Sequence, residues 1–248
     1  MASSIWGAVV RRERSGVPEA AARRRQGSPM ALQLFFHPFS SYCQKALVAL
    51  YENAIPFEAR LLDGPDCPAS RELAGLWPMK RFPVLVDGDR TVIEASCIIE
   101  YLGLSRPGPV RLIPDDPQAA LEVRTMDRFF DNYVATPQQK IVFDALRPEG
   151  SRDPYGVVQA REMLDTAYAW LDKVMAQREW AAGDRFSLAD CGAAPFLFYA
   201  DWTHAIGEAH PHVIAYRRRL LARPSFARAV NEARPYRGFF PLGAPDRD

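Results

Sequence analysis

Six consecutive residues combine hydroxyl, thiol and cationic side chains: Ser40-Ser41-Tyr42-Cys43-Gln44-Lys45. They follow a short apolar run at 31–36 that stops at His37-Pro38, a pattern typical of a buried strand. Apolar residues then recur with helical spacing from Cys43, so a helix is expected to begin after Ser40 or Ser41. The free N–H groups and the dipole at a helix start favour a negative charge. The segment could therefore hold a thiolate, with a serine hydroxyl donating a hydrogen bond to the sulfur.

The energy that such a site must supply is modest. A free thiol has a pKa near 8.5, so only a few per cent of it is ionised at neutral pH. Lowering that pKa by roughly two units needs about 2.7 kcal/mol, which one charge-assisted hydrogen bond and a helix start can supply together. The alternative is that the serine only caps the helix, and these residues taken alone favour that alternative.

The sequence around this segment predicts an α/β domain with the order β-α-β-α-β-β-α. Its expected elements are a strand at 31–36, a helix ending at Ile55-Pro56, a strand at 57–61, a short helix and loop at 67–77, strands at 83–86 and 90–93, and a helix at 94–102. The first two strands should be parallel because a helix joins them. Asp87-Gly88-Asp89 supplies the turn of a hairpin, and Gly103 is placed to end the last helix.

A second, all-helical domain is expected after a stretch rich in proline and glycine. Its helices are predicted at 117–147, 155–178, 187–202 and 211–233, the last with a break at Pro224. The predicted organisation is an α/β domain at 30–103, a linker at 104–116, a helical bundle domain at 117–240 and a tail at 241–248. Residues 1–29 are rich in arginine and lack a continuous apolar segment, so we interpret them as a disordered leader or as the product of a start codon assigned too far upstream.

Charge and composition argue against several classes of protein. The chain carries 31 Lys and Arg against 30 Asp and Glu, so its net charge gives no reason to expect nucleic-acid or anionic-membrane partners. No apolar run approaches the roughly 18 to 20 residues that span a bilayer. The four cysteines form no C-x-x-C pair, and the histidines within 204–212 have no Cys or carboxylate cluster to complete a metal site. We therefore expect a cytoplasmic protein without a disulfide framework or metal.

Four motifs, taken in order along the chain, resemble the cytosolic glutathione transferase family. Ser40-x-x-Cys43 followed by a basic residue is similar to the active-site turn of thioredoxins and glutaredoxins, with serine in place of the nucleophilic cysteine. Phe82-Pro83-Val84-Leu85 resembles the family's Val-Pro-x-Leu with its cis proline, and residues 94–102 resemble its Glu-Ser-x-Ala-Ile-x-x-Tyr-Leu helix start. Residues 183–190 match the capping motif of its helical domain. The chain is thus identified as a serine-type, bacterial-like member with some zeta- and theta-like features.

The resemblance implies a thioredoxin-like domain that binds glutathione and a helical domain that supplies an apolar second site. It assigns Ser40 to activation of the glutathione thiolate, so that Ser41 is expected to serve the helix end or solvent. The other residues that it assigns to glutathione are Arg81, Phe82, Pro83, Glu94, Ala95 and Ser96. Ala95 stands where the family usually has serine, and the adjacent Ser96 can substitute for that hydroxyl. The family also implies a homodimer that conjugates small apolar electrophiles in detoxification.

The second site is expected to draw on aromatic residues of the first long helix. Phe129, Phe130 and Tyr133 are assigned mainly to the core, but some of them should face the cleft between the domains. Ser187-Leu188-Ala189-Asp190 has the S-x-x-D form of a capping box, which is structural and carries no catalytic meaning.

Other functions stay open as alternatives. Ser40-Ser41 and Pro78-Met79-Lys80 resemble a glutathione-dependent isomerase of the zeta type, although Tyr42 replaces that class's cysteine. A catalytically silent member that binds glutathione or a protein partner is the second alternative, and Ala95 favours it. A thiol-disulfide oxidoreductase is disfavoured because Cys43 occupies the buried resolving position.

Overall fold

A computed structural model of the chain describes residues 31–248, which form one compact unit. The leader expected at 1–29 lies outside the described residues. The first elements are β1 (Leu32–Phe36), α1 (Ser41–Glu52), β2 (Phe57–Leu61), α2 (Pro68–Leu76), β3 (Val84–Asp87), β4 (Arg90–Ile93) and α3 (Ala95–Ser105). The helices that follow are α4 (Pro117–Phe129), α5 (Thr136–Ala145), α6 (Pro154–Met175), α7 (Leu188–Thr203), α8 (Pro211–Ala222) and α9 (Pro224–Ala233). In this part of the chain no helix is both long and apolar enough to cross a membrane.

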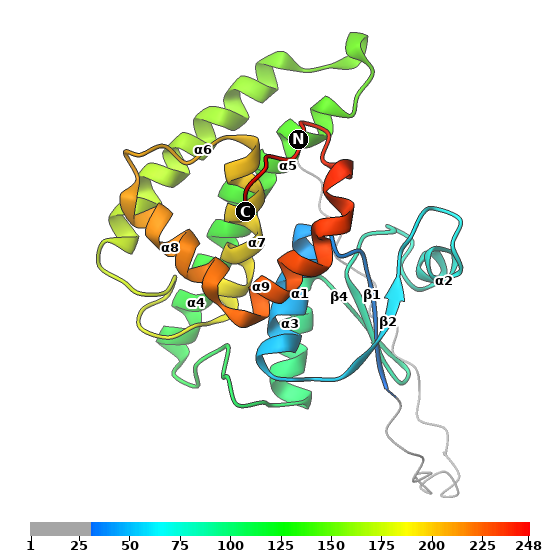
Figure 1. Cartoon of the computed structure of the whole chain (residues 1–248). Coiled ribbons are helices and arrows are strands. Elements are labelled where there is room, and N and C mark those ends of the chain that lie inside the picture. The colour runs from blue at the N-terminus through cyan, green and yellow to red at the C-terminus, as the bar shows by residue number, and fades with distance from the viewer. Residues whose placement is uncertain (1–30) are drawn as a thin grey trace, which may run out of the picture. The chain divides into compact units, whose positions relative to one another are not determined.

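The four strands form one sheet in the order β2-β1-β3-β4. Strands β1 and β2 are parallel, while β3 pairs antiparallel with both β1 and β4. Side chains alternate between the two faces of β1: Leu34 packs with α1 and α3, and its neighbour Phe35 packs with α2. Figure 1 shows α2 at one face of the sheet and α1 and α3 at the other. This thioredoxin-like arrangement confirms the predicted order of elements and the predicted parallel pair.

Helix α3 ends later than the sequence predicted. Gly103 was expected to end it, but Gly103 lies within the helix, which continues to Ser105. The actual stop is Pro107, because a proline disfavours helical backbone in the residue before it. That residue, Arg106, has left the helical conformation with φ −143° and ψ 59°. The last turn is also supported by the Ser105 hydroxyl, which donates to the Tyr101 carbonyl oxygen.

The long helix predicted at 117–147 is divided by a π-helical turn, η1 (Phe130–Ala135). The cause is Pro137, which has no N–H to donate to the carbonyl four residues earlier. A wider turn absorbs this defect, and the Thr136 hydroxyl donates to the Asp131 carbonyl oxygen at 2.9 Å. The turn also shifts the register between α4 and α5, so the two helices present different faces to the rest of the protein.

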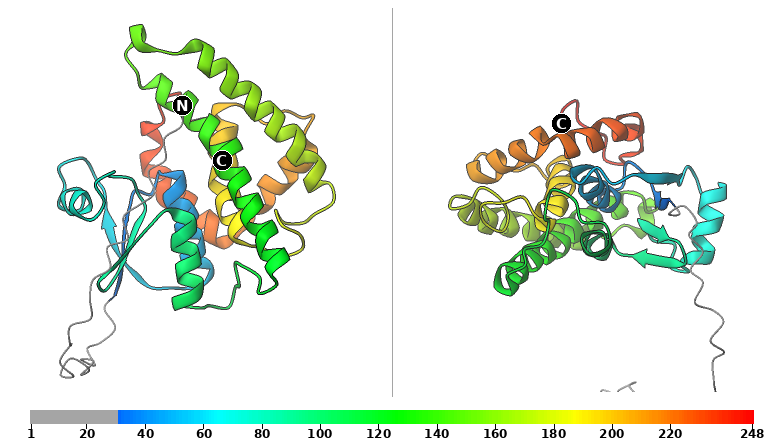
Figure 2. Two further views of the ribbon diagram at one scale, coloured as in Figure 1. Left: turned by 180° about the vertical axis from the view of Figure 1, so that it is seen from behind. Right: turned by 90° about the horizontal axis from the view of Figure 1, so that it is seen from below.

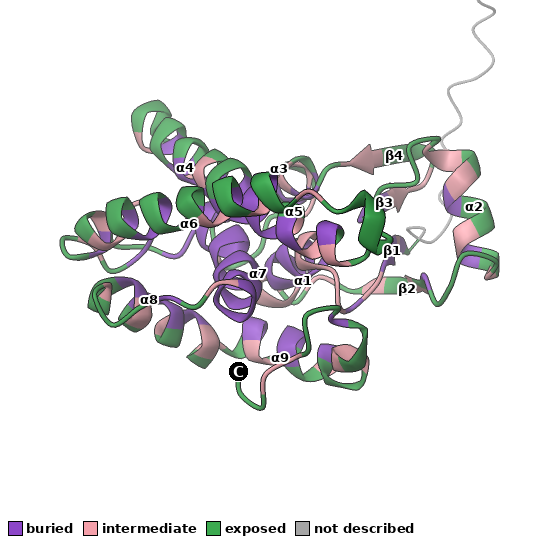
Figure 3. Cartoon of the chain, turned by 90° about the horizontal axis from the view of Figure 1, so that it is seen from above, coloured by how far each residue is buried: buried purple, intermediate pink, exposed green. Residues whose placement is uncertain are grey.

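Helix α7 is the centre of the helical domain, and every one of its residues is buried. Figure 3 shows it in the buried colour along its length, while outward faces of α4, α6 and α8 are exposed. Its start has the predicted capping box, in which Asp190 Oδ2 accepts from both the backbone N–H and the hydroxyl of Ser187 at 2.9 Å. The predicted break at Pro224 is also confirmed, since it separates α8 from α9.

Helix α1 joins the two halves of the molecule. It packs against α3 on the sheet side and against α7 and α9 on the other, as the views in Figure 2 show. The contact includes a buried cation: Lys45 Nζ lies 2.6 Å from Asp127 Oδ1 and 2.8 Å from Asp131 Oδ1. A buried charge is tolerated only when it is paired, so these contacts hold α1 in one position against the helical domain.

Candidate active site

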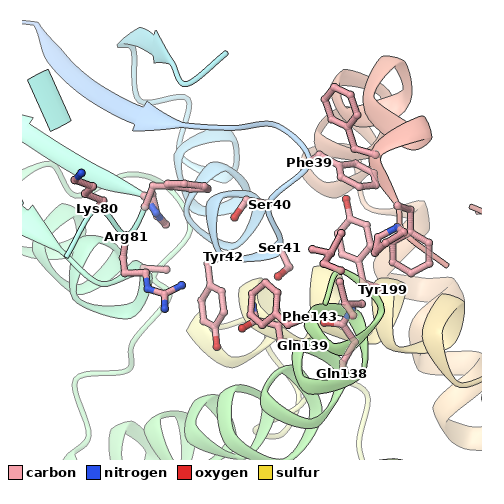
Figure 4. Close-up of a pocket in the computed structure, with 18 of the residues that line it drawn as sticks. Phe39, Ser40, Ser41, Tyr42, Lys80, Arg81, Gln138, Gln139, Phe143 and Tyr199 are labelled. Carbon is pink, nitrogen blue, oxygen red and sulfur yellow. The ribbon is translucent and has the colours of Figure 1, made fainter. Parts of the chain in front are cut away.

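The start of α1 opens into a cavity of about 520 Å³. One side of the cavity comes from the thioredoxin-like part of the chain and the other from α5, α7 and the segment after α9 (Figure 4). Its polar and charged lining residues include Ser40, Ser41, Lys80, Arg81, Glu94, Gln138 and Gln139. The other residues of the lining are Phe39, Tyr42, Trp77, Phe82, Pro83, Ala95, Val142, Phe143, Leu146, Tyr199, Phe239, Phe240 and Pro241.

Ser40 is the N-cap of α1. Its backbone is extended, with φ −83° and ψ 123°, and its Oγ accepts a hydrogen bond from the Cys43 N–H at 3.4 Å. A hydroxyl has one hydrogen to donate as well as lone pairs, so this capping contact leaves Ser40 able to donate to an anion. Capping and thiolate binding are therefore compatible roles for the same oxygen.

Ser41 is the first residue of α1, and its hydroxyl also faces the cavity. Ser41 was expected to serve the helix end or solvent; the capping oxygen belongs to Ser40, which leaves the second of these alternatives as a prediction. Figure 4 shows the Ser40 and Ser41 hydroxyls next to each other at the start of α1. Both serines therefore present a hydroxyl to the same cavity.

Cys43 cannot act as a nucleophile near neutral pH. Its side chain is 0% exposed and packs among Leu34, Leu47 and Leu85 beneath α1. This burial raises the pKa of the thiol to about 12, in spite of the nearby Ser40 hydroxyl. The thiol thus stays protonated, as the buried position expected for Cys43 requires.

Residues 80–83 form the edge of the cavity that precedes β3. The Phe82-Pro83 peptide bond is cis, as the resemblance implied. Arg81, Phe82 and Pro83 all line the cavity, and so does Lys80, which was not among the predicted glutathione-binding residues. Two cationic side chains therefore stand together at this edge.

Glu94 caps α3 in an unusual conformation. Its φ of +65° is rare for a residue other than glycine, and its side chain makes no hydrogen bond to the helix it precedes. The side chain instead lines the cavity, together with Ala95. Strained backbone of this kind persists where the surrounding structure holds it, often at a binding site.

Ser96 is the predicted site residue that does not line the cavity. Its hydroxyl donates to Asp127 Oδ2 at 2.8 Å and accepts from Arg128, so it faces α4. Ser40, Arg81, Phe82, Pro83, Glu94 and Ala95 are brought together around one cavity. The hydroxyl of Ser96 is thus already engaged, although its backbone N–H still belongs to the first turn of α3.

The helical wall of the cavity differs from the expectation. Phe130 is fully buried in the core, and the Phe129 ring packs at a tilt against Trp170 of α6 with centroids 4.5 Å apart; neither side chain lines the cavity. Tyr133 packs beside Phe129 and is also absent from the lining. The residues of this region that do line the cavity lie beyond the π-helical turn, on α5 and at its end. The α5 side of the cavity could have been predicted from the sequence, because its lining residues recur with helical spacing. They are Gln138, Gln139, Val142, Phe143 and Leu146.

Tyr42 adds a neutral polar group between the two sides. Its ring packs against Phe196 with centroids 4.9 Å apart. Burial, followed by the charge of Asp131, raises the pKa of its hydroxyl to about 12. The hydroxyl is therefore a hydrogen-bond donor throughout the physiological pH range.

Among the described residues, no three His, Cys, Asp or Glu side chains come together as a metal site.

Sequence patterns of two known domain families match the chain. The glutathione S-transferase N-terminal domain matches residues 34–109, and the glutathione S-transferase C-terminal domain matches residues 126–219. Together these two regions make up more than half of the chain.

Individual relatives agree with the two domain matches. A stringent starvation protein A homolog from Coxiella burnetii is 27% identical over 82% of this chain and 92% of its own length. The glutathione S-transferase GstB of Escherichia coli K12 is 24% identical over 77% of this chain and 93% of its own length. A crystal structure of a glutathione S-transferase from Methylobacterium radiotolerans, in complex with glutathione sulfonate, superimposes with a TM-score of 0.70 at 28% identity, over 80% of this chain and 94% of that one. The chain therefore belongs to the glutathione transferase family.

Proposed function

We propose that this transferase activates the thiol of bound glutathione and directs it at a small apolar electrophile. The observation that carries the proposal is the position of Ser40, a capping hydroxyl at a helix start that faces the same cavity as the residues expected to bind glutathione. The first turn of α1, Ser41-Tyr42-Cys43-Gln44, contains no acidic residue that would neutralise the helix dipole. A thiolate placed there would gain both the dipole and one hydrogen bond from Ser40.

The tripeptide would lie along the thioredoxin-like side of the cavity. The carboxylate of Glu94 would pair with the γ-glutamyl ammonium, and the N–H groups of Ala95 and Ser96 at the start of α3 would bind the γ-glutamyl carboxylate. The backbone N–H and carbonyl of Phe82 would pair with the cysteinyl residue in the manner of an added strand. Arg81 would pair with the glycine carboxylate.

The electrophile would occupy the side lined by α5, α7 and the segment after α9, where aromatic and aliphatic side chains predominate. The thiol first loses its proton to solvent. The thiolate sulfur then uses a lone pair to form a C–S bond, and a leaving group such as chloride departs with its bonding pair. With an activated alkene no group leaves, and the adjacent carbanion takes a proton from water. Neither step requires an oxidant or a metal, and proximity within the cavity supplies much of the acceleration.

Two measurements on the full chain test this function. Calorimetry with glutathione should give saturable binding, and steady-state assays should give conjugation with at least one aryl halide or activated alkene. Binding without turnover of any electrophile in a broad panel would contradict the transferase activity. Absence of binding would contradict the assignment of the cavity to glutathione.

A catalytically silent binding member is the second candidate. Two observations favour it: Ala95 replaces the hydroxyl that the family usually presents to glutathione, and one relative carries the name stringent starvation protein A homolog rather than a transferase name. Calorimetry and turnover together separate the two candidates, because only the first predicts conjugation. The zeta-type isomerase is tested by adding a cis enone diacid and following its conversion to the trans isomer.

The proposal also covers the oligomeric state, the location and the partners of the protein. We expect a cytoplasmic homodimer that serves detoxification and has neither nucleic acid nor membrane as a partner. Light scattering of the purified chain would report the dimer, and cell fractionation would report the location.

A further inference from the structure

Two tyrosines line the cavity, and their hydroxyl groups lie in different electrostatic surroundings. Tyr42 comes from the first turn of α1, and Tyr199 comes from α7. Burial and then the negative charges of Asp131 and Glu94 raise the pKa of the Tyr42 hydroxyl. Burial also raises the pKa of Tyr199, but the positive charge of Arg237 acts in the opposite direction there. A negative charge that develops on a substrate is therefore favoured beside Tyr199 and disfavoured beside Tyr42.

The Tyr199 side chain is held in one position by aromatic packing. It is only 4% exposed, and its ring meets those of Phe39, Phe198 and Trp202 edge to face, with centroids 5.3, 5.1 and 5.6 Å apart. Figure 4 shows Tyr199 beside Phe39, the residue that precedes Ser40. Edge-to-face contacts of this kind favour one orientation of the ring. The cavity wall thus contains one hydroxyl in a fixed place.

The Tyr199 hydroxyl accepts a hydrogen bond from within the protein. Gln44 of α1 is fully buried, and its Nε2 donates to the Pro38 carbonyl oxygen at 2.9 Å and to Tyr199 Oη at 3.1 Å. A side-chain amide nitrogen is a donor only, so Tyr199 can only accept in this contact. The hydrogen of the tyrosine hydroxyl has no acceptor among residues 31–248. Tyr199 is therefore held through its oxygen and keeps its hydrogen for a ligand in the cavity.

Gln44 also connects this donor to the proposed thiolate site. Its backbone N–H donates to the Ser40 carbonyl oxygen at 2.9 Å, in the first turn of α1. The residue proposed to bind the sulfur and the residue that holds Tyr199 thus belong to one helical turn. Rigid elements therefore set the separation between the thiolate and the Tyr199 hydroxyl. Hydrogen-bond donors that are fixed in this way stabilise a developing charge without having to reorganise during the reaction.

We propose that Tyr199 is a catalytic residue that donates a hydrogen bond to the carbonyl oxygen of an α,β-unsaturated ketone or aldehyde. The inference rests on the proposed function and names the class of electrophile. The thiolate sulfur forms a C–S bond to the β-carbon, and the π electron pair of the alkene moves toward the carbonyl, whose oxygen becomes that of an enolate. Tyr199 stabilises this oxygen and keeps its own proton. The α-carbon then takes a proton from water, which balances the proton that the thiol lost to solvent.

Two electrophiles with the same phenyl ring test this role. Benzylideneacetone carries a conjugated carbonyl, whereas benzyl chloride has no oxygen and releases chloride when sulfur attacks. Tyr199→Phe removes only the hydroxyl and retains the ring. Tyr168→Phe is the matched control, because Tyr168 of α6 is also buried, donates one hydrogen bond to the His204 carbonyl oxygen at 3.0 Å and does not line the cavity.

The measurement is kcat/KM for each electrophile at saturating glutathione. We expect Tyr199→Phe to lower this value for benzylideneacetone by roughly 10- to 100-fold, the effect of one hydrogen bond to a developing charge, and to leave it within about twofold for benzyl chloride. Tyr168→Phe should leave both values within about twofold. Equal losses for the two electrophiles in Tyr199→Phe would overturn the proposal, because they would place the effect in the fold or in the thiolate. An unchanged value for benzylideneacetone would also overturn it.

Failure of the proposed function gives a different result. If the wild-type chain binds glutathione by calorimetry but turns over neither electrophile, the transferase activity is wrong, and Tyr199 is then tested by binding alone. The probes are the glutathione adduct of benzylideneacetone, which carries the ketone oxygen, and S-benzylglutathione, which lacks it. In Tyr199→Phe the Kd of the first should rise roughly three- to tenfold, and the Kd of the second should stay unchanged. Equal changes in the two Kd values, or no change in either, would overturn the proposal.

Discussion

Two helices of this protein begin with a serine cap and differ in what balances the positive end of the helix dipole. At the start of α7, Ser187 is joined by Asp190, whose carboxylate accepts from the N–H groups of Ser187 and Ala181 and from the hydroxyl of Tyr216 at 2.5 Å. At the start of α1, Ser40 has no acidic partner in the first turn and opens into the cavity. One helix start is neutralised from within, whereas the other leaves its positive end for an anion from outside.

The cysteines that follow the two caps are alike, and neither of them provides a negative charge. Cys43 and Cys191 are both fully buried, and burial raises the pKa of Cys43 to about 12 and that of Cys191 well above its usual range. Neither thiol can therefore supply the anion near neutral pH. The free end of α1 is suited to a thiolate that arrives with a ligand.

The largest effect that the comparison predicts is on stability, at α7. Asp190→Ala would leave several buried donors without an acceptor, and we expect a loss of about 3 to 5 kcal/mol in the free energy of unfolding, measured with urea. Asp116→Ala is the control, because Asp116 caps α4 at an exposed position and accepts only from the Ala119 N–H at 2.8 Å. It should cost about 1 kcal/mol. Equal losses in the two variants would contradict the structural role of Asp190.

The next effect concerns α3, whose cap is Glu94. We expect Glu94→Ala to weaken glutathione affinity by roughly 1.5 to 3 kcal/mol, the value of one charge-assisted hydrogen bond, and to leave the fold intact. Calorimetry measures the affinity, and circular dichroism checks the fold. Unchanged affinity would mean that the carboxylate serves only the helix end.

At α1 the expected effect is on turnover. Ser40→Ala should lower turnover near neutral pH by about 10- to 100-fold, because less of the bound thiol is ionised. Ser187→Ala is the matched control: it removes the same hydroxyl from the start of α7 and should cost about 1 kcal/mol of stability with no loss of turnover. If both variants lose turnover equally, the effect comes from the fold and not from the thiolate.

The smallest expected effect is on the pH profile of turnover, which should show only one ionisation. Turnover should rise with pH as the glutathione thiol ionises and then level off. Tyr42 and Cys43 should add no second limb between pH 6 and 10, because burial raises both of their pKa values to about 12. A second ionisation in this range that disappears in Tyr42→Phe would contradict the neutral hydroxyl at this position.

The sequence predicted one side of the cavity better than the other. Ser40, Phe82-Pro83 and Glu94 lie in short motifs, where neighbouring residues decide the local backbone, and the structure gathers them as the motifs implied. The opposite wall depends on which face α5 turns inward after the π-helical turn, and on residues after α9 that return to the cavity from the far end of the chain. Helical spacing could have grouped the α5 residues on one face, but it does not show that this face meets Tyr199 and Phe239, so these two residues were missed.

Helix ends were also predicted unequally well from the sequence. Gly103 fits the usual pattern for a helix end, but α3 continues to Ser105. It stops there because Pro107 disfavours helical backbone at Arg106. Propensity is a weak preference that packing can override, whereas the missing N–H and the ring of proline are steric constraints. Pro224 ended its helix as predicted for that reason.

We propose that the open start of α1 activates a glutathione thiolate through Ser40. The most direct test is the thiolate ultraviolet absorbance of the enzyme–glutathione complex, titrated against pH in the wild-type chain and in Ser40→Ala and Ser41→Ala. We expect Ser40→Ala to raise the pKa of the bound thiol by about one to two units, at 1.36 kcal/mol per unit, and Ser41→Ala to leave it unchanged. A shift in Ser41→Ala without one in Ser40→Ala, or no shift in either variant, would contradict the role of Ser40.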